Sequence, residues 1–290
     1  MLAHLLPELI NGIVLGAFFA IVAIGLSLIM NLTGTINMAH GSFMTLAGYL
    51  AFALVSRGTN FWYALAVAAL LTMLVGILTE RLLVSPLYKR LPIYSLLLTF
   101  GLSLIAEETY RLIWGPSAVP FQPPTYLLGA TTVFGAPLPS YRLVIFAALV
   151  VAMAVLLAFL FRSKVGLRLR AAVQDSEMLS ALGTNTRILY TVNFGIGVAL
   201  AGVAGVFAAG LLGLNPTMGN ELLMPAFITV VIGGMGSIAG SIVGGLLIGV
   251  AVSVATLYVP AASELITYVL MAVVLLIRPR GLFGEEGLFG

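Results

Sequence analysis

Long apolar runs alternate with short polar segments along the chain, and the runs have the lengths that membrane-spanning helices require. A hydrocarbon core of about 30 Å needs about 20 apolar residues in a helix. Longer runs cover residues 9–30, 61–79, 143–161, 190–212 and 238–258, and shorter ones cover 42–55, 93–106, 222–231 and 265–277. None alternates apolar and polar residues as the strands of a membrane barrel must. The pattern predicts an all-α, polytopic membrane protein with about eight or nine transmembrane helices.

Two polar interruptions that contain glycine, at residues 31–41 and 213–221, divide this pattern into two similar halves. In each half a long span is followed by an interruption, a short span, a full span and a short final span. Because an odd number of spans precedes the second copy, the halves run through the membrane in opposite directions. We therefore expect a single transmembrane domain, residues 1–290, with broken or re-entrant segments and an inverted repeat. The halves cover residues 9–112 and 188–278, joined by a span at 141–162 and a polar segment at 163–187.

The two interruptions are the candidate segments for a transport pathway. A broken helix leaves backbone N–H and C=O groups free, which a membrane tolerates only where protein or a water-lined cavity satisfies them. A helix that begins at Ser42 would also present bare amides to an anionic group such as a carboxylate. The alternative is that these are ordinary turn residues, and a lone histidine is more often structural. The candidate pathway residues are Asn37, His40, Gly41, Asn215 and Glu221.

The positive charges predict how the chain is oriented. The chain has thirteen Lys and Arg residues, and the cytoplasmic segments of membrane proteins carry an excess of them. If the N-terminus lies outside, only Arg57, Arg111 and Arg142 fall on outer segments, and the other ten fall on inner ones. The opposite orientation would invert the bias. We therefore expect the N-terminus outside, and the segment 162–189 and the C-terminus in the cytoplasm.

The most polar internal stretch, residues 163–187, lies between two predicted spans on the inner side. Apolar residues at helical spacing predict a short amphipathic helix along the membrane surface, closed by Gly183. A solvated loop that fixes topology through its charge is the plain alternative. We favour a helix that docks a cytoplasmic partner. The apolar positions are Ala171, Ala172, Met178, Leu179 and Leu182.

Composition narrows the possible classes of function. The chain is 61% hydrophobic and 8% charged, whereas soluble domains carry about 25% charged residues. It contains no Cys, which excludes disulfides and thiolate metal sites, and we expect no other metal site. No P-loop, H-E-x-x-H or G-x-S-x-G motif occurs, so we expect no catalytic residues and no bound cofactor. The net charge of +3 is no argument for a nucleic-acid partner in a membrane protein.

Glycine is abundant, at 32 residues, and part of it recurs at close to helical spacing. Small residues at such spacing allow membrane helices to approach each other closely. We expect Gly236, Gly240 and Gly244, near the start of the span 238–258, to serve helix packing.

Sequence blocks spread over the whole chain share one family pattern. The first are Asn11-Gly-Ile-Val-Leu-Gly-Ala and Asn37-Met-Ala-His-Gly41-Ser-Phe-Met. The polar segment contributes Gly166-x3-Arg170-Ala-x2-Gln174-Asp175 with Ala181-Leu-Gly183. The last are Ile232-Gly-Gly-Met-Gly-Ser237 and Arg278-Pro-Arg-Gly-Leu-Phe283. In this order they closely resemble the permeases of branched-chain amino acid ABC importers, and the chain length resembles that of the smaller, H-type permease.

The resemblance implies an ATP-driven importer of branched-chain amino acids in a bacterial or archaeal cytoplasmic membrane. Such a permease works with a second permease, either a paralogue or another copy, with two cytoplasmic ATPases that bind the ATP, and with an extracytoplasmic solute-binding protein. The polar segment would then be the coupling segment that docks an ATPase. The Glu of the more widespread Glu-Ala-Ala coupling loop is absent from residues 165–172. The matching residues are Gly166, Arg170, Ala171, Gln174, Asp175 and Gly183.

The sequence leaves two alternatives open. Related permeases carry urea, short amides or other amino acids, and nothing in the sequence defines a pocket for an aliphatic side chain. A stand-alone secondary transporter or channel is the alternative from another class, although few ionisable residues lie within the predicted spans. Copurification of ATPase subunits separates this second alternative from the importer.

Overall fold

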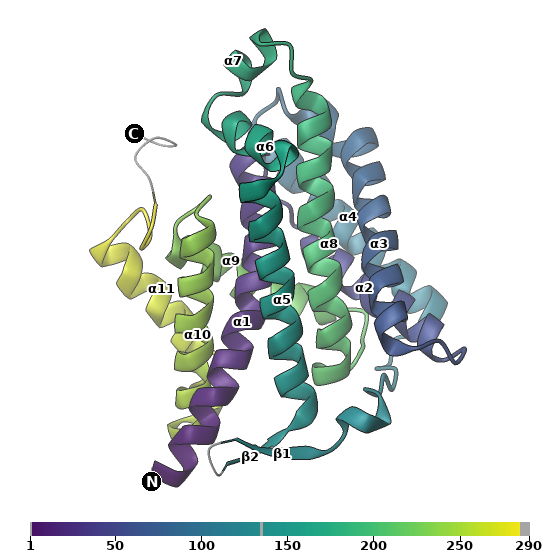
Figure 1. Cartoon of the computed structure of the whole chain (residues 1–290), viewed down its shortest axis with the longest axis vertical. Helices are drawn as coiled ribbons and strands as arrows, with labels where there is room; N and C mark the ends of the chain where they lie inside the picture. Colours follow the sequence, from purple (N-terminus) through teal and green to yellow (C-terminus); the bar gives the residue numbers. More distant parts are fainter. Residues whose placement is uncertain (1, 134–135, 285–290) are drawn as a thin grey trace.

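The computed structural model describes residues 2–133 and 136–284, which form a bundle of long helices that lie roughly along one direction (Figure 1). The helices are α1 (Leu2–Thr33), α2 (His40–Val55), α3 (Phe61–Thr79), α4 (Pro92–Trp114), α5 (Ser140–Arg162), α6 (Lys164–Gln174), α7 (Ser176–Ala181), α8 (Thr186–Leu212), α9 (Met218–Gly233), α10 (Ile238–Tyr258) and α11 (Leu265–Ile277). α1 and α8 run through the middle, with α10 and α11 on one side and α2, α3 and α4 on the other (Figure 1). The short helices α6 and α7 lie at the end opposite to the N-terminus (Figure 1).

Five described segments are long and apolar enough to cross a membrane: α1, α3 with its continuation to Leu87, α5, α8 and α10. α2, α9 and α11 are apolar but shorter. Large apolar side chains such as Leu78, Val151 and Val155 are exposed on the outside of the bundle. In water such a surface would be unstable, whereas lipid accommodates it. The prediction of a polytopic helical membrane protein is confirmed.

α3, α10 and α11 have the bounds that their apolar runs predicted, but α4 does not. It continues to Trp114, whereas the predicted span ended at residue 106. Two contacts extend it: Glu107 pairs with Arg111 one turn later, and Trp114 stacks on Tyr49 with ring centroids 4.4 Å apart. The polar residues that interrupted the hydropathy pattern therefore belong to the helix and support its last turns.

α1 and α8 cross at glycine residues, which brings their backbones into direct contact. A Cβ atom on Gly25 would lie 2.7 Å from the carbonyl oxygen of Gly197, and one on Gly197 would lie 2.6 Å from that of Gly25. The neighbouring side chains of Ile24 and Phe194 are completely buried. Because lipid supplies no hydrophobic drive for association, close packing of this kind holds membrane helices together. The crossing therefore forms the centre of the bundle.

The elements of the two halves pair in the same way but in opposite directions. α2 and α9, which follow the two interruptions, each contain 16 residues. α1 packs on α10, and α8 packs correspondingly on α3. α1 ascends from the end that carries the N-terminus, whereas α8 descends from the opposite end (Figure 1). On this basis we propose that residues 9–112 and 188–278 form an inverted repeat, joined by α5 and the segment 163–187.

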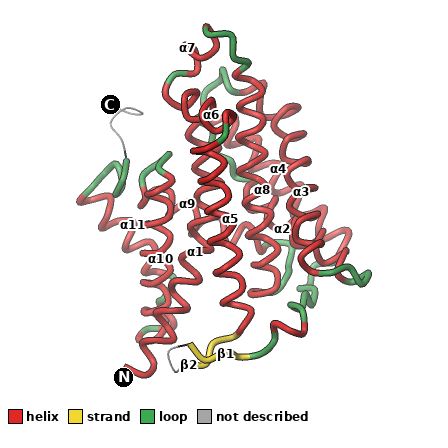
Figure 2. Tube along the Cα trace, in the orientation of Figure 1, coloured by secondary structure: helices red, strands yellow, loops and turns green. Residues whose placement is uncertain are grey.

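One small element departs from the all-α prediction. Residues Ala130–Val133 (β1) and Ala136–Pro139 (β2) pair as an antiparallel hairpin before α5 (Figure 2). Upstream of the hairpin, the amide of Val119 donates a hydrogen bond to the carbonyl of Leu214 at 2.7 Å. This bond ties the connecting segment to the second interruption. The strands are four residues long and β2 contains two prolines, so they form no apolar run that a sequence pattern would detect.

Candidate functional site

The first turns of α2 and α9 touch each other inside the molecule. They meet at Gly41 and Gly219, where a Cβ atom on either residue would collide with the backbone of the other. Thr45 supports the contact, because its Oγ1 accepts a hydrogen bond from the amide of Gly219 at 2.9 Å. α2 begins two residues before the expected helix start at Ser42. The N-termini of both helices therefore lie side by side in the interior.

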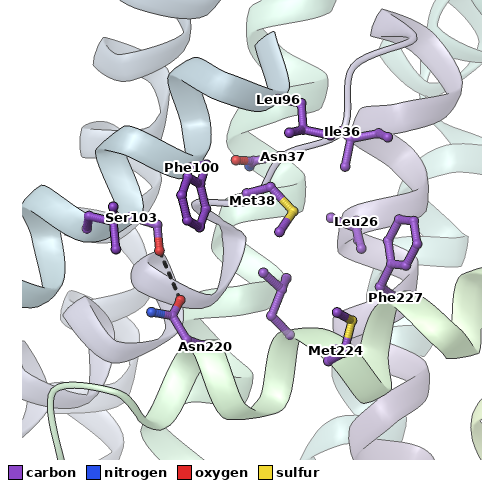
Figure 3. Close-up of a pocket in the computed structure, with 12 residues that line it drawn as sticks. Leu26, Ile36, Asn37, Met38, Leu96, Phe100, Ser103, Asn220, Met224 and Phe227 are labelled. Carbon is purple, nitrogen blue, oxygen red and sulfur yellow. Dashed lines mark hydrogen bonds between the residues drawn. The ribbon is translucent and has the colours of Figure 1, made fainter. Parts of the chain in front are cut away.

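An apolar cavity of about 360 Å³ opens beside these first turns (Figure 3). Its walls come from α1, the first interruption, α4 and α9. Small-molecule sites typically measure about 300–1,000 Å³ and combine apolar walls with a few polar groups. The cavity has this character. Its lining residues are Leu26, Ile36, Asn37, Met38, Leu96, Phe100, Ser103, Leu104, Asn220, Leu223, Met224 and Phe227.

A chain of hydrogen bonds joins α2, α4 and α9 at one side of the cavity. The hydroxyl of Ser42 donates to Ser103 Oγ at 3.1 Å, and Ser103 donates to Asn220 Oδ1 at 3.0 Å (Figure 3). Asn220 Nδ2 donates in turn to Glu107 Oε2 at 3.0 Å. Each group orients the next, so the polar wall of the cavity is held in place. Among the residues that the structure describes, no three His, Cys, Asp or Glu side chains come together as a metal site would need.

Asn37 brings an unused donor to the cavity. Its side chain is 1% exposed, and its Oδ1 accepts a hydrogen bond from the amide of Ala39 at 3.1 Å. Its Nδ2 has no hydrogen-bond partner among the described residues. The next residue, Met38, is anchored because its amide donates to Thr99 Oγ1 at 3.0 Å. A buried donor without a partner costs free energy, which a ligand with an acceptor would recover.

The other predicted pathway residues lie around the cavity but do not line it. His40 is completely buried beside Gly25 in the crossing of α1 and α8. Asn215 Oδ1 accepts the amide of Thr217 at 2.9 Å and shapes the turn before α9. Glu221 is exposed and accepts a hydrogen bond from Thr217 Oγ1 at 2.6 Å. Asn215 and Glu221 therefore shape the second interruption and His40 packs in the helix crossing, whereas Asn37 is the one of these candidates that lines the cavity.

The wall that α4 contributes to the cavity was not predicted from the sequence. A signal was present, because Ser95, Thr99 and Ser103 recur every four residues in an otherwise apolar helix, and all three are buried. Side chains at this spacing share one helix face. In a membrane, a polar face turns toward protein or a cavity and away from lipid.

The polar segment 163–187 folds as two helices, α6 and α7, and not as the single amphipathic helix that was expected. Ser163 caps α6, because its Oγ accepts the amide of Gly166 at 2.9 Å. Asp175 interrupts the helix with an extended backbone and caps α7, because its Oδ1 accepts the amide of Met178 at 2.8 Å. Asp175 thus sets the angle between the two helices.

The residues of the predicted coupling segment divide into supporting and exposed positions. Gly183 adopts φ +84°, which favours glycine, at the turn after α7. The Arg170 guanidinium lies 4.7 Å above the centre of the Phe161 ring. Ala171 is half-buried, while Gln174 and Asp175 are exposed. α6 buries its other face against the ends of α5 and α8. It is therefore docked on the bundle and presents its polar face outward.

Replacing Gly166 by alanine should displace α6. A Cβ atom there would collide with the carbonyl of Leu160 and lie 2.5 Å from that of Phe159, in the last turn of α5. We expect a loss of roughly 1–3 kcal/mol in the packing of α6, which hydrogen exchange of α6 amides would register as faster exchange. Gly183→Asn is the control, because it changes a turn glycine with open space to a residue that tolerates positive φ. Unchanged exchange in Gly166→Ala would contradict this account.

The three glycines that were expected to pack helices have two different positions. Gly240 and Gly244 lie in α10 against the backbone of α9, where a Cβ on Gly244 would lie 2.8 Å from the carbonyl oxygen of Thr229. Gly236 lies before the helix, in a turn with φ +88°. Its carbonyl accepts a hydrogen bond from Asn31 Nδ2 at 3.0 Å. Gly236 therefore acts as a turn residue, because its positive φ favours glycine.

Comparison with known protein families assigns the chain to a family of membrane permeases. The model of the branched-chain amino acid transport system / permease component family matches residues 8–277. The chain belongs to this permease family. It is accordingly a multi-pass membrane transport protein, whose relatives are described as branched-chain amino acid permeases.

Relatives match this permease over most of its length. LivH of Salmonella typhimurium and BraD of Pseudomonas aeruginosa, both high-affinity branched-chain amino acid transport system permease proteins, are each 30% identical over 97% of this chain and 96% of their own. LivM of Escherichia coli, 26% identical, matches 76% of this chain and 57% of its own. The nearly full-length match to LivH confirms the resemblance to the H-type permease. No solved structure gives a significant match.

Proposed function

We propose that this chain is the smaller permease of an ATP-driven importer of branched-chain amino acids in a bacterial or archaeal cytoplasmic membrane. The observation that carries the proposal is the meeting of two helix N-termini beside an apolar cavity, in a member of this family. The partners are a second permease, two ATPases that bind the ATP, and an extracytoplasmic solute-binding protein. In this assignment the chain itself carries no catalytic residue and no cofactor.

The chemistry of the cavity supports an aliphatic amino acid as substrate. Phe100, Leu104 and Met224 offer apolar surface to a branched side chain. Asn37 Nδ2 is a free donor for the carboxylate, and Asn220 Oδ1 is an acceptor for the ammonium group. The proposed pathway passes the contact of Gly41 with Gly219. His40, Asn215 and Glu221 lie in the two interruptions that border this contact.

The end that carries α6 and α7 has the features of a docking surface for an ATPase. Leu167, Met178 and Leu182 are exposed there among charged residues, and an apolar patch with a polar rim is typical of protein interfaces. The excess of Lys and Arg on the segments at this end supports a cytoplasmic location. The N-terminus then lies outside, and Gly166, Arg170, Ala171, Gln174, Asp175 and Gly183 form the coupling segment.

Vesicles that contain the purified transporter, with the ATPase subunits facing the interior, should accumulate radiolabelled leucine when ATP is enclosed in the vesicles. Leu104→Trp should reduce this uptake at least about tenfold, because the indole would occupy space that the substrate side chain needs. The ATPase subunits should still copurify with this variant, since Leu104 lies on α4, remote in sequence from the coupling segment. Uptake of leucine, isoleucine, valine, urea and acetamide should be measured side by side.

Leu112→Trp is the matched control for this experiment. Leu112 lies on the same helix, is 79% exposed and does not line the cavity, so its uptake should equal that of the unchanged protein. Accumulation of urea or acetamide without leucine would replace the proposed substrate. Accumulation by this chain alone, driven by a sodium or proton gradient, would show a secondary transporter and contradict the importer.

A further inference from the structure

A second cavity, of about 290 Å³, opens between the end of α3 and the start of α8. Arg81 contributes to it from the π-helical turn Glu80–Val84 that continues α3. Asn185, Arg187, Ile188 and Thr191 contribute from the cap and first turns of α8. The two helices lie beside each other at the end that carries α6 and α7 (Figure 1). The cavity therefore lies where the bundle meets the membrane interface, away from the cavity of Figure 3.

The basic side chains of this second cavity are unpaired. Neither the Arg81 nor the Arg187 guanidinium forms a salt bridge or a side-chain hydrogen bond with any residue that the structure describes. Both side chains are exposed. The N-terminus of α8 adds partial positive charge to the same place. Two guanidinium groups and a helix N-terminus together supply the positive charge and the donors that a phosphate group needs.

One carboxylate lies close to these arginines, and its oxygens are already engaged. Glu80 is completely buried. Tyr88 donates a hydrogen bond to its Oε1 at 2.8 Å, and Thr191 donates to its Oε2 at 2.7 Å. Burial, and then the neighbouring Glu80, raise the pKa of Tyr88, so the phenol remains a donor. Even with Glu80 counted as charged, the two arginines leave the cavity with a positive excess.

An apolar stripe leads along α3 to the basic cavity. Leu74 and Leu78 lie seven and three residues before Arg81, which places all three on one helix face. Leu74, Leu78 and Leu82 are 50%, 58% and 63% exposed, and Ile188 is exposed at the edge of the cavity. A free inorganic anion would make no contact with this stripe, whereas an acyl chain would cover it. Basic pockets between transmembrane helices bind anionic lipid headgroups in this way.

We propose that this cavity binds the phosphate of an anionic phospholipid, with Arg81 and Arg187 on the headgroup and an acyl chain along Leu74 and Leu78. The lipid would join the end of α3 to the start of α8, directly beside the coupling segment. Its assignment to the cytoplasmic leaflet rests on the proposed orientation, but the binding itself does not.

Native mass spectrometry of the delipidated protein, titrated with phosphatidylglycerol, tests the proposal. Arg81→Gln combined with Arg187→Gln should weaken phosphatidylglycerol binding by at least about tenfold, and each single substitution should give part of this loss. Arg90→Gln combined with Arg168→Gln is the matched control, because it removes the same charge from exposed residues outside the cavity. Circular dichroism should show equal helix content in all variants. The assay requires neither ATPase nor transported substrate, so its outcome is separate from that of the transport experiment.

Three outcomes would overturn the proposal. The first is equal retention of phosphatidylglycerol by the cavity double variant and the control double variant. The second is equal binding of phosphatidylcholine and phosphatidylglycerol to the unchanged protein. The third is displacement of the lipid by millimolar inorganic phosphate, which would show a site for a soluble anion.

Discussion

Replacing Gly219 by alanine is expected to abolish transport and to lower the yield of folded protein strongly. A Cβ atom at this position would collide with the carbonyl of Gly41 and lie 2.6 Å from Thr45 Oγ1. Backbone cannot move aside as a side chain can, so we expect a cost of about 3 kcal/mol or more, the upper end for overpacking. Fluorescence-detected size exclusion measures the folded yield, and leucine uptake in vesicles measures function.

Gly101→Ala is the matched control for this substitution. Gly101 lies in α4, and a Cβ atom there would meet no atom within 4 Å. In a helix interior, alanine is more stable than glycine by roughly 0.5–1 kcal/mol. Yield and uptake should therefore be at least as high as in the unchanged protein. A Gly219→Ala protein that folds and transports normally would show that α2 and α9 do not meet as described.

The double variant Arg170→Ala, Asp175→Ala is expected to hydrolyse ATP without importing substrate. Asp175 caps α7, and loss of such a cap costs about 0.5–2 kcal/mol, which a helix of six residues cannot absorb. Arg170 loses its contact with the Phe161 ring, worth about 0.5–2 kcal/mol. The segment that we propose to dock the ATPase would then lose its shape. ATPase activity and leucine uptake, measured on the same vesicles, give the coupling ratio.

Asp175→Asn separates the shape of this segment from its charge. Asparagine keeps the oxygen that accepts the Met178 amide, so it preserves the cap and removes only the negative charge. Normal coupling in Asp175→Asn together with uncoupling in the double variant would assign the effect to helix geometry. Normal uptake by the double variant would count against any docking role of α6 and α7.

Two of the helices whose bounds were predicted, α3 and α10, each begin directly after a turn residue that caps them. Asn60 caps α3 and Ser237 caps α10, each through a side-chain oxygen that accepts an amide of the first turn. Both signals are local, so pattern and structure agree within a residue. α4 lacks such a signal at its far end, where Glu107 and Arg111 read as surface charge although they stabilise the last turns of the helix.

The cavity could not be predicted in the same way, because its walls come from distant segments. The hydrogen bond between Ser103 and Asn220 joins residues 117 positions apart in the chain. The sequence marked the two interruptions as candidate pathway segments, yet it did not reveal which side chains turn inward. Asn37 became a candidate because it lies in an interruption, whereas the apolar lining of α4 and α9 resembled lipid-facing surface.

The contact of α2 with α9 at Gly41 and Gly219 also has an electrical consequence. Each helix N-terminus carries about half a unit of positive charge, and in a medium of low dielectric constant two such ends repel cations strongly. Opposed helix ends exclude protons and metal ions from other membrane pores in this way. A passage that opens around this contact would admit a zwitterion and still prevent a leak of cations that would dissipate the membrane potential.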